Sequence, residues 1–289
     1  MESTMKKIML ASVALVLGGA GTASAADALP PIVEAPYVEA PVTHKVEAAS
    51  GWYLRGDAGY SWNKIDNPQF FQGSNANYVG FASSDLRGSY SVGVGVGYQV
   101  RSYLRTDLTL DYFSKADFTG STRGGGAAAG ACVGACTSRD YSSVSGMSLL
   151  ANAYVDFYKH GRFTLYGGAG IGGTYVKWDG LSNTSCSDAN PALCDATVNH
   201  SGHSSWRFTY ALMAGASIDV TCNLKADIGY RYRNISGGKM FGYALGGGPG
   251  YDNGFSSHEA RGGLRYSFGG CAQEEVYVEP APIMPVVYK

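Results

Sequence analysis

The segment Tyr90–Val100 reads Tyr-Ser-Val-Gly-Val-Gly-Val-Gly-Tyr-Gln-Val, so two kinds of residue alternate along it. Tyrosine or valine occupies every second position, and serine, glycine and glutamine occupy the positions between. A period of two is that of a β-strand and fits no helical face. A soluble sandwich would bury the valines, whereas a membrane barrel would turn them to lipid and the small residues to a polar interior. The segment predicts a strand but does not decide its surroundings.

The rest of the chain supplies seven more alternating segments. They cover residues 51–62, 104–113, 143–158, 162–178, 205–220, 224–233 and 258–268. Three short connections (101–103, 159–161 and 221–223) alternate with four long ones (63–88, 114–142, 179–204 and 234–257). A lipocalin-like soluble barrel would also alternate its connections, but aromatic residues near both strand ends favour a membrane. We predict an all-β fold, an eight-stranded antiparallel up-and-down transmembrane β-barrel over residues 51–268.

The remaining segments flank this barrel. Residues 1–25 have a charged start, an apolar core and the small-residue box Ala23-Ser24-Ala25, which predicts a secretory signal peptide. Residues 26–50 form a Pro-rich linker, and residues 269–289 form a Pro-rich tail. An even strand number places both flanks in one compartment, which we expect to be the periplasm, with the long loops outside the cell. With a net charge of −1, the chain lacks the excess of basic residues that is typical of nucleic-acid-binding proteins.

Three of the strands carry a resemblance to a known family. The first begins Gly-Trp-Tyr-Leu-Arg-Gly-Asp-Ala-Gly-Tyr at residue 51, the second contains Gly-Val-Gly-Val-Gly-Tyr, and the last reads Gly-Gly-Leu-Arg-Tyr-Ser-Phe. Together with the signal peptide, they resemble the small outer-membrane β-barrels of Gram-negative bacteria, in particular alphaproteobacterial surface antigens, opacity proteins and the OmpA membrane domain. The resemblance implies that Leu264, Tyr266 and Phe268 form the closing-strand signal for the outer-membrane assembly machinery. In that family the signal usually ends the chain, whereas here 21 residues follow Phe268.

The positions between the lipid-facing residues are rich in charge. Eight are basic and seven acidic: Arg55, Arg105, Arg207, Lys225, Arg231, Arg233, Arg261, Arg265, Asp57, Asp107, Asp111, Asp156, Asp219, Asp227 and Glu259. Because the interior of an eight-stranded barrel holds only side chains, these charges must pair. The pattern favours a salt-bridge plug over an ion path with a charged gate, and acid–base catalysis by Asp107 and Asp111 is the weakest alternative.

The six cysteines predict disulfides in an oxidising compartment. Cys222 and Cys271 fall at the short-turn end, so we expect them to pair. The other four fall in long loops, and short loop closure favours Cys132–Cys136 and Cys186–Cys194. A zinc site of Cys186, Cys194, His200 and His203 is a weaker alternative, because no tight ligand pair is present.

The function that we expect from the sequence is structural. We predict a surface-exposed outer-membrane protein that contributes to envelope integrity, with no catalytic mechanism and no cofactor. A narrow pore for ions or small solutes is the first alternative, and an adhesin that uses its four long loops is the second. The expected partners are outer-membrane lipid and lipopolysaccharide, the assembly machinery, and host or surface ligands at the loops.

Overall fold

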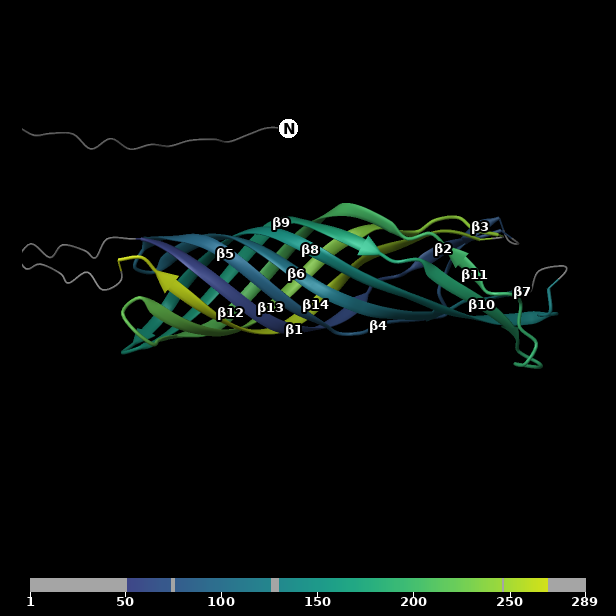
Figure 1. Ribbon diagram of the computed structural model, residues 1–289, viewed down its shortest axis with the longest axis horizontal. Coiled ribbons are helices and arrows are strands. Elements are labelled where there is room, and N and C mark those ends of the chain that lie inside the picture. The colour runs from purple at the N-terminus through teal and green to yellow at the C-terminus, as the bar shows by residue number, and fades with distance from the viewer. Residues whose placement is uncertain (1–50, 74–75, 126–129, 246, 270–289) are drawn as a thin grey trace, which may run out of the picture. The chain divides into compact units, whose positions relative to one another are not determined.

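The computed structural model describes residues 51–73, 76–125, 130–245 and 247–269, and these residues form β-strands and connecting turns (Figure 1). The eight long strands are β1 (Trp52–Ile65), β5 (Ser89–Arg101), β6 (Leu104–Ser121), β8 (Ala135–His160), β9 (Phe163–Trp178), β12 (His203–Asp219), β13 (Leu224–Phe241) and β14 (Gly247–Ser267). The short strands are β2 (Gln69–Gln72), β3 (Asn77–Gly80), β4 (Ser83–Leu86), β7 (Arg123–Gly125), β10 (Leu181–Ser187) and β11 (Val198–His200). No helix within the described residues is long and apolar enough to cross a membrane.

The long strands close into a ring. Each pairs antiparallel with the next in the order β1, β5, β6, β8, β9, β12, β13 and β14, and β14 pairs back with β1. In the closing pair, Tyr53 lies opposite Ser267 and Ile65 lies opposite Phe255. Closure leaves no unpaired edge in the ring. The predicted eight-stranded antiparallel barrel is therefore confirmed.

The two ends of the barrel differ. Tight turns join β5 to β6, β8 to β9 and β12 to β13, and Gly161 in one of them has a φ of 57°, which favours glycine. This is the short-turn end, where β1 begins and β14 ends, at the left of Figure 1. The opposite end carries the six short strands and is called the long-loop end below.

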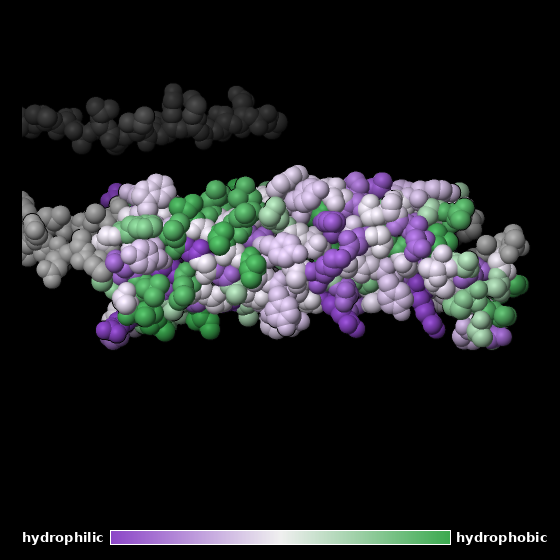
Figure 2. Space-filling view, in the orientation of Figure 1, coloured by the Kyte–Doolittle hydropathy of each residue, from purple (hydrophilic) through white to green (hydrophobic). Residues whose placement is uncertain are grey.

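The strand that contains Tyr90–Val100, β5, is oriented as a membrane barrel requires. In β5, Val92, Val94 and Val96 point outward and are 58%, 62% and 40% exposed. The glycines between them point inward, where a Cβ at Gly93 would collide with Asp111 and one at Gly97 would collide with Tyr53. Glycine on this face therefore makes room for large interior side chains. The outward apolar residues form the broad hydrophobic area of Figure 2 near the short-turn end.

Aromatic residues border this apolar area on both sides. Trp52 and Tyr98 are in edge-to-face contact near the short-turn end, and Tyr60 contacts Trp62 and Tyr90 farther along the barrel. Trp62 lies ten residues after Trp52 along β1. At about 3.4 Å per residue and a tilt of about 40°, they span roughly 26 Å, which matches the lipid-facing band of an outer-membrane barrel.

The four long connections were predicted as loops, and this prediction is wrong for much of their length. β6 continues to Ser121, β8 begins at Ala135, β13 continues to Phe241 and β14 begins at Gly247, so the barrel extends well beyond the aromatic residues. The physical reason is an inversion of the pattern. Beyond the lipid-facing band the outward side chains become polar, while the inward ones, such as Phe118, become apolar.

The inward side chains of this extension form the apolar core of the protein. Phe118 packs edge-to-face on Trp178, and Phe113 packs edge-to-face on Phe255, with ring centres 5.8 and 6.4 Å apart. The cluster consists of Ile65, Leu86, Phe113, Ala116, Phe118, Val144, Val176, Trp178, Leu181, Ile235, Met240, Phe241 and Phe255. An apolar layer therefore fills the barrel on the long-loop side.

Residues 1–50 and 270–289 lie outside the described residues. The signal peptide, the linker, nearly all of the tail and Cys271 belong to these segments. Their predicted roles stay predictions.

Candidate functional site

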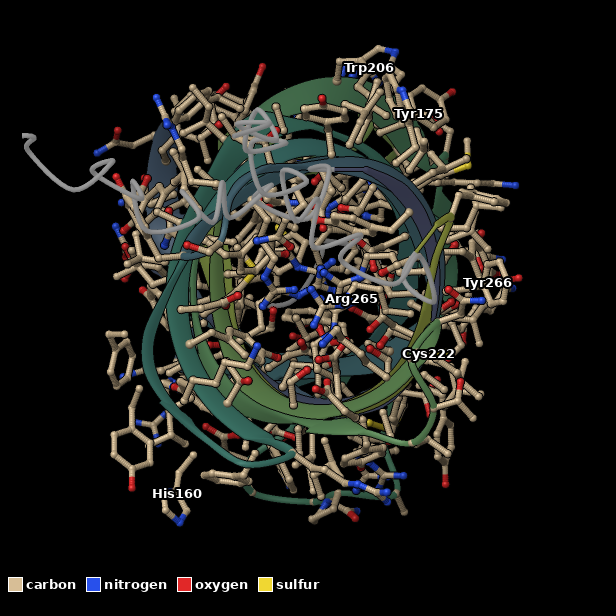
Figure 3. The ribbon with its side chains drawn as sticks, turned by 90° about the vertical axis from the view of Figure 1, so that its left-hand side faces the viewer. His160, Tyr175, Trp206, Cys222, Arg265 and Tyr266 are labelled. Atoms are coloured by element: carbon tan, nitrogen blue, oxygen red, sulfur yellow. A yellow bond between two sulfur atoms is a disulfide. The ribbon has the colours of Figure 1, made fainter. Side chains whose placement is uncertain are left out.

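The barrel interior on the short-turn side of the apolar layer holds most of the charges that the alternation predicted. All fifteen point inward, and Figure 3 shows Arg265 among them, near the middle of the ring as seen from the short-turn end. The order along β14 gives their level in the barrel: Arg265 lies nearest the short-turn end, followed by Arg261, Glu259 and then Phe255 of the apolar layer. The interior therefore changes from charged to apolar along its length.

Arg55 is the centre of the level nearest the short turns. It donates through Nε and Nη2 to the two carboxylate oxygens of Asp57, each at 2.8 Å. Its Nη1 donates to Asp107 at 2.9 Å and to the hydroxyl of Tyr154 at 3.0 Å. Arg261 reaches Asp57 from the opposite side at 3.0 Å. Each carboxylate thus faces at least one guanidinium, as burial of charge requires.

Aromatic rings fill the space between these charges. The guanidinium of Arg105 lies 4.5 Å from the ring centres of both Tyr154 and Tyr166, and its Nε donates to Asp156 at 3.3 Å. Stacked guanidinium groups keep their charge while they exclude water from the ring faces. The alternation places both tyrosines on the inward face, as observed, but they were not predicted as part of the charged network.

Arg265 lies at the same level as Arg55, directly opposite it in the register of the neighbouring strands β14 and β1. It pairs with Asp227 at 3.3 Å and donates to Ser217 at 2.8 Å. Lys225 pairs with Asp219 closer to the short turns, where both side chains are partly exposed. This end of the interior is therefore closed by paired charges.

The next level is organised by Arg231, which lies between two carboxylates. Its Nη1 donates to Asp111 at 2.9 Å, and its Nη2 donates to Glu259 at 2.8 Å. Ser91 donates to the other oxygen of Glu259 at 2.9 Å, so this carboxylate also has a neutral donor. Arg231, Asp111 and Glu259 are completely buried, so charge-assisted hydrogen bonds close the interior at this level.

Two of the predicted arginines lie apart from this network. Arg233 forms no ion pair within the described chain, but it donates to Ser148 and Ser257 and lies over the ring of Phe113. Arg207 lies in the barrel extension, where its Nη1 donates to both oxygens of Asp252 at 2.7 and 2.9 Å. Sequence reasoning missed Asp252 because it falls in a stretch that was predicted as a loop. Its inclusion gives eight basic and eight acidic residues in this set, and one further buried carboxyl, Asp140, lies farther along the extension.

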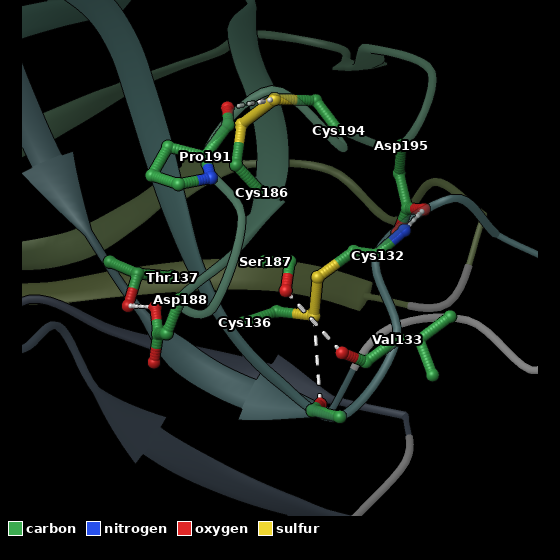
Figure 4. The surroundings of a disulfide bond; sticks show 11 residues. Cys132, Val133, Cys136, Thr137, Cys186, Ser187, Asp188, Pro191, Cys194 and Asp195 are labelled. Atoms are coloured by element: carbon green, nitrogen blue, oxygen red, sulfur yellow. Dashed lines mark hydrogen bonds between the residues drawn. A yellow bond between two sulfur atoms is a disulfide. The ribbon is translucent and has the colours of Figure 1, made fainter.

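The cysteines of the long-loop end form two disulfides, Cys132–Cys136 and Cys186–Cys194. The two disulfide-bonded loops contact each other, as Figure 4 shows. The backbone N–H of Cys132 donates to Asp195 at 2.8 Å, and Thr137 donates to Asp188 at 2.7 Å. Cys186 and Cys194 are bonded to each other, so they are not free to ligate zinc, and no metal-binding cluster occurs among the described residues.

At the short-turn end, Cys222 lies in the turn between β12 and β13 (Figure 3). Because Cys271 is outside the described residues, their pairing stays a prediction. The three residues of the predicted assembly signal, Leu264, Tyr266 and Phe268, point outward and are about half exposed. They border the lipid-facing area at the end of the closing strand.

The long-loop end also exposes apolar side chains beyond the extension. Val133, inside the first disulfide loop, is 75% exposed, and Leu193, beside the second disulfide, is 46% exposed. Ser187 connects the two positions, because its hydroxyl donates to the carbonyl of Val133 and its N–H donates to the carbonyl of Leu193. The surface formed by Val133 and Leu193 on these hydrogen-bonded loops is called the loop tip below.

Relatives of the chain are found both by sequence and by fold. An uncharacterized protein of Brucella abortus strain 2308 is 39% identical, and the match covers 88% of this chain and 96% of that protein. A putative adhesin of Rickettsia bellii strain OSU 85-389 is 28% identical over 74% of this chain and 87% of its own length.

Among solved structures, the outer membrane protein OprG of Pseudomonas aeruginosa matches with a TM-score of 0.46 and 12% identity, covering 76% of this chain and 97% of its own. Neisserial surface protein A matches with a TM-score of 0.41 and 17% identity, covering 76% and 98%. The family model described as "outer membrane protein beta-barrel domain" matches residues 12–268. The chain therefore belongs to the family of outer-membrane β-barrel proteins.

Proposed function

We propose that this chain is a non-conducting structural barrel of the Gram-negative outer membrane that presents its long-loop end at the cell surface. In this orientation both tails are periplasmic, and the barrel extension rises above the lipid with its polar outer face in water. The short turns on one side and the long loops on the other support this orientation, since transmembrane barrels keep their short turns in the periplasm.

The observation that carries the proposal is the closure of the interior at two successive levels. Paired charges fill the half near the short turns, and the apolar cluster around Phe118 and Trp178 fills the half near the long loops. A hydrated ion that crosses the barrel would have to separate buried ion pairs and then lose its water among aromatic rings. The geometry thus supports a structural barrel better than the narrow pore.

Liposome swelling tests whether solutes pass. We expect vesicles that contain the refolded protein to shrink in arabinose at the rate of protein-free vesicles, whereas vesicles with a general porin swell. Swelling that rises with the amount of folded barrel would refute the non-conducting function. Protease treatment of intact cells tests the orientation, because it should cut the long-loop end and spare residues 26–50 and 273–289.

Attachment to a host or to another surface is a second candidate, and the loop tip favours it. Two disulfides and the hydrogen bonds between the loops hold Val133 and Leu193 in place, so a partner would order little chain on binding. The name of the Rickettsia bellii relative, a putative adhesin, points in the same direction.

A loop-tip variant tests attachment. V133S with L193S should reduce the binding of cells to a host surface while leaving the surface amount of the protein unchanged. Equal binding by cells with the wild type, the double variant and a deletion of the gene would exclude attachment.

A further inference from the structure

The outer surface at the long-loop border of the lipid-facing band has a regular order. Tyr112, Met147, Tyr175 and Trp206 are adjacent in register on β6, β8, β9 and β12, and all four point outward. Tyr175 and Trp206 pack together with ring centres 5.6 Å apart, and Figure 3 shows both on the outside of the ring. We call these four residues, three of which are aromatic, the aromatic row. Under the proposed function, they lie at the level where the acyl chains of the outer leaflet meet its headgroups.

Two residues farther along each strand lies a second row of a different kind. Ser145 is opposite Lys177, and Lys177 is opposite Ser204. Lys115 lies in the irregular step of β6 between Phe113 and Ala116, which brings it beside Ser145. Two residues of strand measure about 7 Å, so this cationic row, Lys115, Ser145, Lys177 and Ser204, lies just above the aromatic row.

The polar groups of the cationic row are largely unused by the protein. Lys177 is exposed and forms no ion pair within the described chain, and neither Ser145 nor Ser204 has a side-chain hydrogen bond there. Lys115 pairs with Asp179 at 2.6 Å, but its side chain is 65% exposed. The row therefore offers two hydroxyl donors and two ammonium groups to a ligand outside the barrel. Lys115 is paired with Asp179, and Lys177 is near the same carboxylate but forms no ion pair with it.

We propose that the cationic row binds a phosphate group of the outer-leaflet glycolipid lipopolysaccharide, whose sugar and upper acyl chains pack on the aromatic row. This inference rests on the membrane orientation of the proposed function. A phosphate fits the donors, because it accepts hydrogen bonds from hydroxyl and ammonium groups at the same time. Its position fits as well, because a lipid phosphate lies just outside the apolar band, where Lys177 is placed. A soluble protein partner is a poorer fit, because the row directly adjoins the lipid-facing band.

The test uses the full-length mature protein refolded in neutral detergent micelles. Lipid A with both phosphates, lipid A without phosphate and phosphatidylglycerol are titrated separately, and binding is measured as the rise in the unfolding temperature. We expect phosphorylated lipid A to bind the wild type. We expect K177Q to weaken this binding about fivefold, because a lysine near an anionic lipid surface contributes on that order. K159Q, at an exposed lysine near the short turns, is the matched control and should bind like the wild type.

Two further variants separate direct binding from a structural role. K177R keeps the positive charge and should restore binding. D179N removes the carboxylate that competes for Lys115, so it should strengthen binding, which a merely structural effect would not do.

Four results would overturn the proposal. They are equal weakening by K177Q and K159Q, binding of phosphate-free lipid A as tight as that of phosphorylated lipid A, equal binding of phosphatidylglycerol, and displacement of lipid A by millimolar inorganic phosphate. Heat-modifiable gel migration of each variant shows independently whether the barrel is folded. The proposed function fails separately, if the protein is absent from outer-membrane fractions or conducts solutes.

Discussion

The guanidinium of Arg233 lies 5.0 Å from the centre of the Phe113 ring, at the level where the charged half of the barrel interior meets the apolar half. Arg233 is fully buried and donates to two serine hydroxyls, but it forms no ion pair within the described residues, and Glu259 and Asp111 act on it only over a longer distance. The ring face of Phe113 therefore stands where a counter-ion would be expected. The two halves of the interior are coupled at this contact.

Replacing the ring tests that coupling. F113L should destabilise the barrel by about 2 kcal/mol more than F255L, because both variants lose apolar contacts but only the first removes the ring over a desolvated cation. Phe255 is a suitable control, since it is equally buried and packs on Phe113. Urea unfolding of the refolded protein measures both values. Equal losses would mean that the contact of Arg233 with the ring contributes nothing to stability.

The trio of Arg231, Asp111 and Glu259 gives a larger effect. R231M should cost about 3–5 kcal/mol of unfolding free energy, because it leaves two buried carboxylates without their main partner. R139M, at an exposed arginine of β8, should change stability little. Adding E259Q to R231M should recover part of the loss, since one uncompensated charge disappears. The claim of an ionic closure is wrong if R231M unfolds like R139M.

The lipid-facing side of β5 is tested by a charge at Val94. V94R should destabilise the membrane-inserted barrel by about 2–4 kcal/mol, because it places a cation in the middle of the apolar band. V220R, in the turn between β12 and β13, is the control, since Val220 is also about half exposed but lies outside the band. Unfolding in lipid vesicles measures the difference. Equal tolerance of both arginines would place the band elsewhere.

The long-loop end should respond to pH through Asp140. This carboxyl is buried and accepts hydrogen bonds from Ser138 and Asn183, and burial raises its pKa to about 6 from the ordinary 3.8. The folded extension therefore binds a proton that the unfolded chain releases between about pH 4 and 6. Stability contributed by this proton is complete below about pH 4 and is lost as the pH rises through 6.

Lowering the pH from 7 to 5 should accordingly stabilise the extension by about 1 kcal/mol. Hydrogen exchange of β8 and β10, corrected for the intrinsic pH dependence of exchange, measures the change. D140N keeps the shape of the side chain and should abolish the response. A response of the same size in D140N would assign it to another group.

The part of each strand that could be predicted from the sequence is the part whose outward face meets lipid. Around Val94 the outward residues are apolar and the inward ones small or charged, so a simple alternation identified the strand, its orientation and the interior charges. Beyond Tyr112 the outward face meets water and the inward face becomes apolar, so the same search ended β6 at Phe113, eight residues before its actual end at Ser121. Asp252 was missed for this reason.

Other features depend on contacts between distant segments. The partner of Arg207 could not be inferred from spacing, because it is set by the register of β12, β13 and β14 in the extension. Strands as short as β7 and β11 form only because β8 and β10 offer them an edge. A period of two needs more than three residues to be visible, so no pattern marks them in the sequence.

Single-channel current recording tests the central claim, the closed interior, most directly. The refolded wild-type protein is added to a planar lipid bilayer in 1 M KCl, with heat-modifiable migration confirming that it is folded. The ion pairs and the apolar cluster predict a flat current trace at every protein concentration. Discrete, uniform current steps whose frequency increases with the amount of folded protein would contradict a closed barrel and would establish a pore instead.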